Sequence, residues 1–475
     1  MGLMDHFDQQ PLPKRWQEES THWQDTYFQE LSEVQDEAQW NRFYPERPVT
    51  TLAVIQARPD SFGTYASKAL AAVPETSVLT HRVNRAEDLN DEQFHIALKI
   101  IQAQASTELG SIQQHRMVYA KLDNGSLTGV DREIVEGIHR TDGYSDTYPG
   151  TLEVLSFSAK RVCVEELRHH YQMAGVLTLD PTWDQRDGRR YATEALEELF
   201  AMKPGEHILD AFNLPFLSLL DEAVFMALID RVGKYQLEMQ HHFLYAPMAL
   251  SMPFMRFIEE SYHLAAGERL TKAIAVAGTL DGGNFGIEDL QHTINAWYPR
   301  GLEMFGSELS GQQVKGVFKT LLNAEAQAIF TREVEGKVQD INRTVIMAKT
   351  GMDRTRASQI LKRIQKTGET VQGLGPADLV RLPDRRFFRF RGLTEFADHR
   401  ERDPETGRLG YVYLPYDLDG QLMADGGKPV PRETYVEYLR TVLPDRYLNC
   451  PHWEDMKTKF LLNPRWQDSD PSFST

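Results

Sequence analysis

Cysteine is almost absent from this chain of 475 residues, which contains only Cys163 and Cys450. The two are far apart and no Cys-x-x-Cys spacing occurs, so nothing supports a disulfide framework, a zinc ribbon or an iron–sulfur cluster. Any bound metal ion would therefore have to be held by carboxylates and imidazoles.

Long apolar runs are also missing. The most apolar stretch, residues 212–232, is interrupted by Asp221, Glu222 and Asp230, whereas a membrane-spanning helix needs about 18 or more apolar residues in a row. Residues 1–10 contain two aspartates and no apolar stretch, which argues against a signal peptide. We therefore expect a cytoplasmic protein without membrane contact.

Basic residues are fewer than acidic ones: the chain has 52 Lys and Arg, 69 Asp and Glu, and a net charge of −17. Nucleic-acid binding needs clustered cationic surface, so we expect no such partner. Residues 345–364, with Gly351 between two helical patterns, resemble a helix-turn-helix, but in this acidic chain we interpret them as a helical hairpin. A regulatory scaffold built on that hairpin is the corresponding non-enzymatic alternative.

Helical spacing of apolar residues dominates from residue 91 onward and predicts an all-α protein built around a bundle. Pro215 would bend the third long helix, and Pro253 suits the first turn of the fourth. The predicted helices span about 91–120, 151–178, 207–245 and 253–277, with more from 286 to 336.

Composition divides the chain into three expected parts. Residues 1–85 are polar and broken by prolines, and we expect a helical extension packed on the core, with a strand at 51–57. Residues 86–336 would form the helical domain. Residues 337–475 would form a smaller, irregular accessory region, because Pro, Gly, Arg and Tyr become denser there.

The motif Glu-x-x-His would allow a helix bundle to bind two metal ions. Residues three apart share one face of a helix, so the carboxylate and the imidazole point to the same site. Two such pairs, with one carboxylate from each of two further helices, supply six ligands. The sequence contains six copies: Glu19/His22, Glu92/His95, Glu136/His139, Glu166/His169, Glu238/His241 and Glu260/His263.

The surroundings of these copies differ. The first three lie in polar or charged segments, which is typical of solvated surface. Glu166/His169 and Glu260/His263 lie within long amphipathic helices, as inward-pointing ligands require. The copy that begins at Glu238 competes with them by position alone.

Two isolated acids are candidates for the remaining ligands. Glu108 and Asp230 lie in or directly after apolar runs, where a carboxylate is unfavourable unless it is paired or coordinated. Their positions alone do not distinguish a metal ligand from a buried ion pair, such as one between Asp230 and Arg231 or Lys234.

Several segments resemble one family, the oxygenase component of benzoyl-CoA epoxidase, whose members are ferritin-like diiron proteins related to the phenylacetyl-CoA epoxidase catalytic subunit. The resemblance covers about residues 90–400. Its segments are 104–116 (QASTELGSIQQHR), 165–169 (EELRH, like an E-E-x-R-H motif), 230–237 (DRVGKYQL, like D-R-x-G-K-x-Q-L), 259–263 followed by Gly267-Glu268 (like E-E-x-x-H with a downstream G-E), 302–310 and 388–391.

The resemblance implies a ferritin-like four-helix bundle with a diiron centre and leaves Glu238/His241 in a supporting role. The connector between the first two ligand helices is longer than in the family, and Leu167 stands where the family has glycine. Both departures concern the substrate entrance, so the substrate stays open. The implied metal ligands are Glu108, Glu166, His169, Asp230, Glu260 and His263.

Carboxylates with two imidazoles suit iron, with manganese as an alternative at one site. The resemblance implies that two iron ions (Fe2+/Fe3+) activate O2 to epoxidise or hydroxylate an aromatic or unsaturated small molecule, with CoA thioesters such as benzoyl-CoA among the candidates. The chain has no dinucleotide fingerprint and no cysteine cluster, which indicates a separate NAD(P)H-dependent reductase.

Gln104 and two arginines each have two candidate roles. Gln104, one turn before Glu108, would contact a ligand or bound oxygen, or serve as a core glutamine. Arg389 and Arg391 would bind CoA phosphates or pair with nearby acids.

Two other functions fit the same sequence features. One is a diiron N-oxygenase acting on an arylamine, and the other is a non-catalytic iron-binding or ferroxidase-like protein. We expect a monomer or a homodimer.

Overall fold

The computed structural model describes most of residues 82–383, together with 411–414, 428–431, 441, 443, 444 and 446. Within the first range it leaves out 124–126, 142–161, 163–164, 167–168, 171, 178–179, 203–206, 241–242, 259–262, 281–284 and 307–316. The expected extension before residue 82, including the strand predicted at 51–57, lies outside the described residues.

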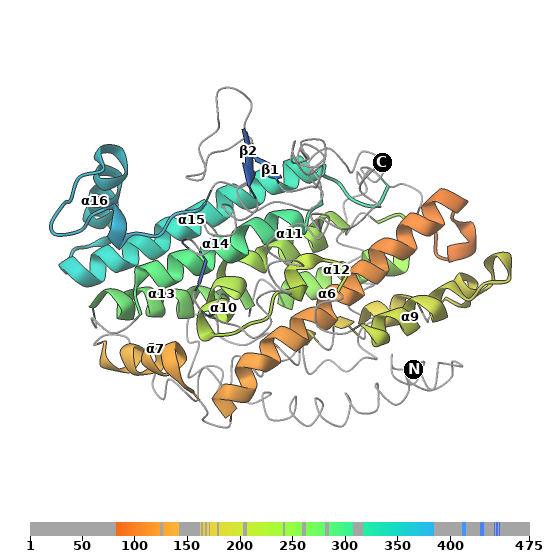
Figure 1. Ribbon diagram of the computed structural model, residues 1–475. Coiled ribbons are helices and arrows are strands. Elements are labelled where there is room, and N and C mark those ends of the chain that lie inside the picture. Colours follow the sequence, from red (N-terminus) through yellow and green to blue (C-terminus); the bar gives the residue numbers. More distant parts are fainter. Residues whose placement is uncertain are drawn as a thin grey trace.

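The described part of the chain is mostly helical, as predicted (Figure 1). Its α-helices are α6 (Asp91–Asp123), α7 (Gly129–Arg140), α9 (Tyr191–Ala201), α10 (Leu219–Val224), α11 (Arg231–Gln240), α12 (Ala246–Ile258), α13 (Leu264–Leu280), α14 (Ile287–Glu303), α15 (Asn323–Thr350) and α16 (Arg354–Thr367). A π-helical turn, η5 (Phe225–Ile229), joins α10 to α11. Short 3-10 turns are η1 (Ala86–Asp88), η2 (Pro181–Asp184), η3 (Arg186–Gly188), η4 (Asp210–Asn213) and η7 (Pro376–Asp378).

Two short strands were not predicted. Strands β1 (Tyr411–Leu414) and β2 (Lys428–Pro431) pair antiparallel, with Tyr411 opposite Pro431. They lie in the region where an irregular accessory segment was expected. Among the described residues, no helix combines the length and the apolar character that crossing a membrane requires.

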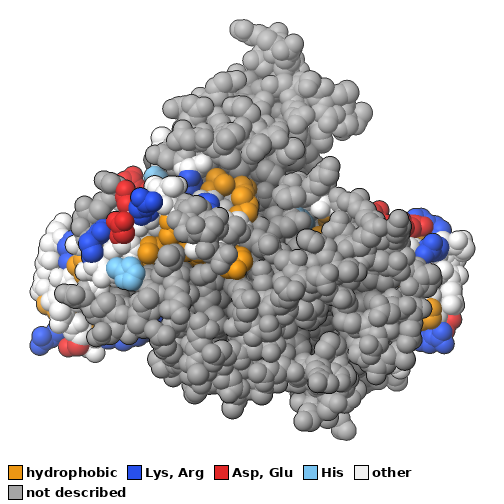
Figure 2. Space-filling model, turned by 90° about the horizontal axis from the view of Figure 1, so that it is seen from below, with side chains coloured by type: hydrophobic (Ala, Val, Ile, Leu, Met, Phe, Trp, Pro, Cys, Tyr) orange, Lys and Arg blue, Asp and Glu red, His pale blue; other side chains and the backbone are white. Residues whose placement is uncertain are grey.

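Long helices lie side by side in two groups. Helices α13, α14 and α15 run next to one another, and α6 runs beside α9 (Figure 1). Their apolar faces form one large core, while a small separate core lies between α15 and α16. Seen from below, side chains of both charge signs are interspersed at the two ends of the visible described surface (Figure 2).

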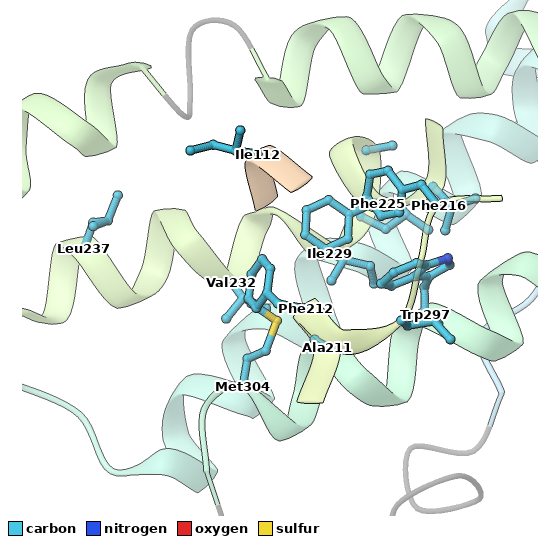
Figure 3. Close-up of a cluster of buried hydrophobic side chains, with 14 of the residues drawn as sticks. Ile112, Ala211, Phe212, Phe216, Phe225, Ile229, Val232, Leu237, Trp297 and Met304 are labelled. Atoms are coloured by element: carbon cyan, nitrogen blue, oxygen red, sulfur yellow. The ribbon is translucent and has the colours of Figure 1, made fainter. Parts of the chain in front are cut away.

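An aromatic cluster fills the main core between α10, η5 and α14. The rings of Phe216 and Phe225 meet Trp297 at centroid distances of 5.2 and 5.3 Å, both edge to face (Figure 3). The indole N–H of Trp297 donates to Asp221 Oδ1 at 3.0 Å. Because Arg446 also binds Asp221, a residue near the chain end is joined to the core.

Some helix boundaries were predicted and others were not. The prediction of a helix over 91–120 is confirmed by α6. The helix predicted from residue 207 instead begins at Leu219, because Ser218 caps it and Asp221 completes the capping box. Pro215 therefore precedes this helix and does not bend it.

The prediction for Pro253 is wrong. Pro253 lies inside α12, which begins seven residues earlier at Ala246, and α13 begins only at Leu264. The apolar segment before Pro253 extends the helix toward its N-terminus, so the proline does not mark a helix start.

The hairpin interpretation of residues 345–364 is confirmed. Helix α15 ends at Thr350, Gly351 adopts a left-handed conformation with φ of 66°, and α16 starts three residues later. Helix α15 also continues through residue 336, where the boundary between the second and third parts was expected.

The π turn η5 shifts the helix phase just before Asp230. The backbone N–H of Asp230 donates to the carbonyl of Phe225, five residues earlier, at 2.9 Å. Side chains compensate the disturbed pattern: Thr271 Oγ1 donates to the Ala223 carbonyl and Arg231 Nε to the Ala227 carbonyl. The extra residue in this turn rotates everything after it by about 100° relative to a regular helix.

Helix α13 packs directly against the π turn at Gly267. A Cβ atom at this position would lie 2.4 Å from the backbone N of Ala227 and 2.5 Å from the carbonyl carbon of Met226. Neither backbone atom can rotate away, so only glycine permits this close approach.

We therefore predict that Gly267→Ala lowers the free energy of unfolding by about 1–3 kcal/mol, because α13 must move away from η5. Urea unfolding followed by circular dichroism measures the effect. The matched control is Gly336→Ala at an exposed position of α15, where an added Cβ meets no atom within 4 Å. The control should gain about 0.5–1 kcal/mol from helix propensity, and equal effects of the two substitutions would contradict the packing argument.

Candidate metal centre

Five of the six predicted ligands converge inside the helical core, and all five side chains are buried. They come from four parts of the chain: Glu108 from the middle of α6, Glu166 and His169 from the helical residues between 162 and 177, Asp230 from directly after η5, and His263 from directly before α13. The sixth, Glu260, lies outside the described residues.

The five side chains form two groups that share one member. Donor atoms of Glu108, Glu166 and His169 lie within 4.8 Å of one another, and so do those of Glu166, Asp230 and His263. Glu166 therefore belongs to both groups.

Glu166 presents one oxygen to each group. Its Oε2 lies 3.7 Å from Nδ1 of His169, and its Oε1 lies 3.3 Å from Nδ1 of His263. Each imidazole meets a second carboxylate, Glu108 at 3.4 Å for His169 and Asp230 at 3.2 Å for His263. This is the arrangement in which one carboxylate can bridge two metal ions.

Several polar atoms of the centre have no hydrogen-bond partner in the described part of the chain. They are both ring nitrogens of His169 and Oε2 of Glu166, all fully buried. Buried polar atoms without a partner are rare in folded proteins, because each loses its contact with water without compensation. Metal ions at this position would satisfy them, and the set of oxygen and imidazole donors suits iron or manganese.

The pKa values of these side chains follow from their burial and from the charges next to them. Burial and the nearby Glu166 raise the pKa of Glu108 to about 8. Burial would lower the pKa of His169, but the nearby carboxylates of Glu108 and Glu166 outweigh it and raise that pKa to about 10. Burial likewise opposes ionisation of Glu166, yet His169 and His263 hold its pKa well below the usual value. Protons thus balance the buried carboxylates, and metal binding would displace them.

Gln104 lies where the sequence placed it, one turn before Glu108 on α6. Its Nε2 donates to Glu108 Oε1 at 2.6 Å. The Oε2 atom of Glu108 faces His169, so the amide fixes which oxygen of the carboxylate turns toward the centre. Gln104 therefore orients the carboxylate of Glu108, a candidate ligand.

Glu165 is a component of the centre that the sequence argument used only as part of a motif. It is fully buried, and its Oε2 lies 3.0 Å from Nε2 of His263. The other ring nitrogen of His263 faces Asp230 and Glu166. A carboxylate behind a metal-binding imidazole fixes the ring orientation and makes the ligand more basic. Its position directly before Glu166 was the available signal.

Arg231 turns away from Asp230. It pairs with Glu268 and Glu333, and Lys234 also contacts Glu333. These contacts join α11 to α13 and α15 next to the centre. The alternative of an ion pair between Asp230 and Arg231 is therefore wrong.

The remaining candidates lie elsewhere. Glu92, Glu136 and Glu238 are exposed on α6, α7 and α11, and Glu136 pairs with Arg140 on the surface. Positions outside the described residues are His22, His241, Arg389 and Arg391, along with Glu19.

Comparison with known proteins relates part of the chain to an oxygenase. No family model matches the chain. A stretch of 164 residues is 30% identical to benzoyl-CoA oxygenase component B of Aromatoleum evansii. The match covers 32% of this chain and 34% of that protein, so the chain matches about a third of its relative's length. The relationship is distant and partial, and it suggests an enzyme of the oxygenase class.

We predict that the wild type takes up two iron ions per chain and Glu166→Gln one or fewer, because an amide cannot bridge two cations as a carboxylate does. Iron content after anaerobic reconstitution measures the effect. The control is Glu238→Gln, which removes the exposed acid of a competing Glu-x-x-His copy. Retention of two ions by Glu166→Gln would contradict the shared-ligand geometry.

Glu165→Leu should lower iron affinity by about 10- to 100-fold, because His263 loses the partner of its Nε2 atom. Glu165→Gln keeps an acceptor at the same place and should have a smaller effect. Competition with a coloured chelator gives both affinities. Equal affinities in wild type and Glu165→Leu would show that this contact does not support metal binding.

Proposed function

We propose that this chain is a diiron oxygenase. Two iron ions would bind between Glu108, Glu166 and His169 on one side and Glu166, Asp230 and His263 on the other. Glu260 would be the sixth protein ligand. The observation that carries the proposal is that the two oxygens of Glu166 face two different buried imidazoles.

The surrounding helices support the same proposal. The donors come from α6, from the helical residues between 162 and 177, from the α10–η5–α11 segment and from α13. In a ferritin-like four-helix bundle, each of the four helices contributes ligands to the metal centre. We therefore propose this fold for the metal-binding part, within the predicted domain 86–336.

The residues of this chain would bind, orient and shield the metal ions. Bound between these residues, a pair of reduced iron ions would provide the redox chemistry for reaction with dioxygen. Gln104 and Glu165 hold Glu108 and His263 in place, so the ligands need little rearrangement when ions bind. The apolar residues of η5, all buried, help to keep bulk water away from the neighbouring centre.

The proposed reaction inserts one oxygen atom into an aromatic or unsaturated substrate. Its balance is substrate plus O2, two electrons and two protons, giving oxygenated product and water. The electrons would come from a separate NAD(P)H-dependent reductase. Benzoyl-CoA is a candidate substrate because the related protein is a benzoyl-CoA oxygenase component, and Arg389 and Arg391 would then bind the CoA phosphates.

A single experiment separates this function from the alternatives. The protein is loaded with Fe(II), kept reduced without oxygen, and mixed with 18O2 and either benzoyl-CoA, an arylamine or no substrate. We expect an organic product that carries one 18O atom, detected by mass spectrometry, and none from Glu166→Gln. A product only from the arylamine indicates N-oxygenation. Oxygen consumption without any organic product indicates a ferroxidase-like protein and contradicts the proposal.

A further inference from the structure

A second buried pair of ionisable side chains lies in the core, apart from the metal-binding groups. Nδ1 of His115 on α6 lies 2.7 Å from Oε2 of Glu222 on α10. Both side chains are almost completely buried. Neither belongs to the two groups of candidate ligands, and among the described residues neither is hydrogen-bonded to a member of those groups.

The pair lies on the same two elements that supply Glu108 and Asp230. His115 follows Glu108 by seven residues on one face of α6, which is about 10 Å along a helix. Glu222 precedes Asp230 by eight residues on the α10–η5 segment, which is about 12 Å. The two elements run in opposite directions. The buried faces between them therefore form one polar strip, with Glu108 and Asp230 at one end and His115 and Glu222 at the other.

Polar atoms without partners line this strip. Nε2 of His115, Oε1 of Glu222 and Oγ of Ser111 are all buried and have no hydrogen-bond partner among the described residues. Ser111 lies on α6 between Glu108 and His115. Buried polar groups that the protein leaves unsatisfied are commonly bridged by ordered water, which needs two to four polar partners.

Two aromatic rings pack against the His115 end of the strip. Phe216 meets the His115 ring at 5.0 Å and Phe225 meets it at 5.8 Å, both edge to face. These two rings belong to the aromatic cluster of the core (Figure 3). A polar strip beside an apolar wall gives protons one preferred route, because moving a charge through the apolar side is unfavourable.

From this geometry we propose that His115 and Glu222, with Ser111 and bridging water, deliver protons to the metal centre. The inference rests on the proposed function. Each turnover consumes two protons and two reductase-derived electrons, and the centre is buried. A proton leaves His115 Nε2 toward Ser111 and the metal centre, and Glu222 supplies its replacement at Nδ1. Bridging water at Oε1 of Glu222, in exchange with solvent, then returns a proton to that carboxyl group. Imidazole suits this role because it holds a proton on either ring nitrogen.

The test uses His115→Gln and Glu222→Gln, which keep polar side chains of similar size. Tyr245→Phe is the matched control, because it removes a buried hydroxyl elsewhere in the core, where Tyr245 contacts Asp180. All proteins are loaded with iron and their iron content is measured. Proton uptake is then followed with an indicator dye during anaerobic reduction by reduced methyl viologen, without oxygen or substrate. The solvent deuterium isotope effect on oxygen consumption is measured separately.

We expect full iron loading in every protein and proton uptake at least about ten-fold slower in His115→Gln and Glu222→Gln than in wild type. Both variants should also show a larger solvent isotope effect, and Tyr245→Phe should match wild type in both measurements. Unchanged uptake in the two variants, with iron loaded and reduced, overturns this inference alone and leaves a structural ion pair. Absence of iron from the wild type overturns the proposed function and this inference with it.

Discussion

The candidate metal centre is dominated by one constraint: several carboxylates are buried next to one another, which is unfavourable unless their charges are offset. Glu108, Glu165, Glu166 and Asp230 lie together in an apolar core, where isolated negative charges would destabilise the folded state. His169 and His263 offset part of that repulsion, and the raised pKa values of Glu108 and His169 are consistent with protons offsetting more of it. Such an arrangement is poorly explained by stability alone, because apolar side chains would fill the same space with less electrostatic cost. It is well explained by cation binding, since metal ions neutralise the carboxylates and satisfy the free nitrogen atoms of His169.

Much of the neighbouring structure positions those side chains. The π turn η5 changes the helix phase immediately before Asp230, and π turns inside α-helices are frequently found at functional sites. Thr271 binds a carbonyl near this turn, and Gly267 lets α13 approach it closely enough for His263 to reach Asp230. The same segment carries Glu222 at its other end. One irregular helix therefore connects the candidate metal centre with the proposed proton route.

Sequence patterns predicted some elements better than others. The long amphipathic pattern of α6 and the glycine at 351 predicted a helix and a hairpin correctly, because caps and periodicity are local properties. The patterns around Pro215 and Pro253 were misread, since neighbouring helices and the Ser218 cap decided where α10 and α12 begin. The strand pair at 411–431 had no local signal strong enough to predict it, because each strand is only four residues long.

Spacing and an apolar context in the amino-acid sequence made several acids and histidines candidate ligands without choosing among them. The resemblance to a diiron oxygenase component then implied one set: Glu108, Glu166, His169, Asp230, Glu260 and His263. Only the tertiary structure decided that five of them meet, that Glu166 serves both groups, and that Glu165 lies behind His263. The physical reason is that a helical pattern specifies one face of one element, whereas the meeting of faces depends on packing. The π turn and the close contact at Gly267 set that packing, and neither has a recognisable signature in a single sequence.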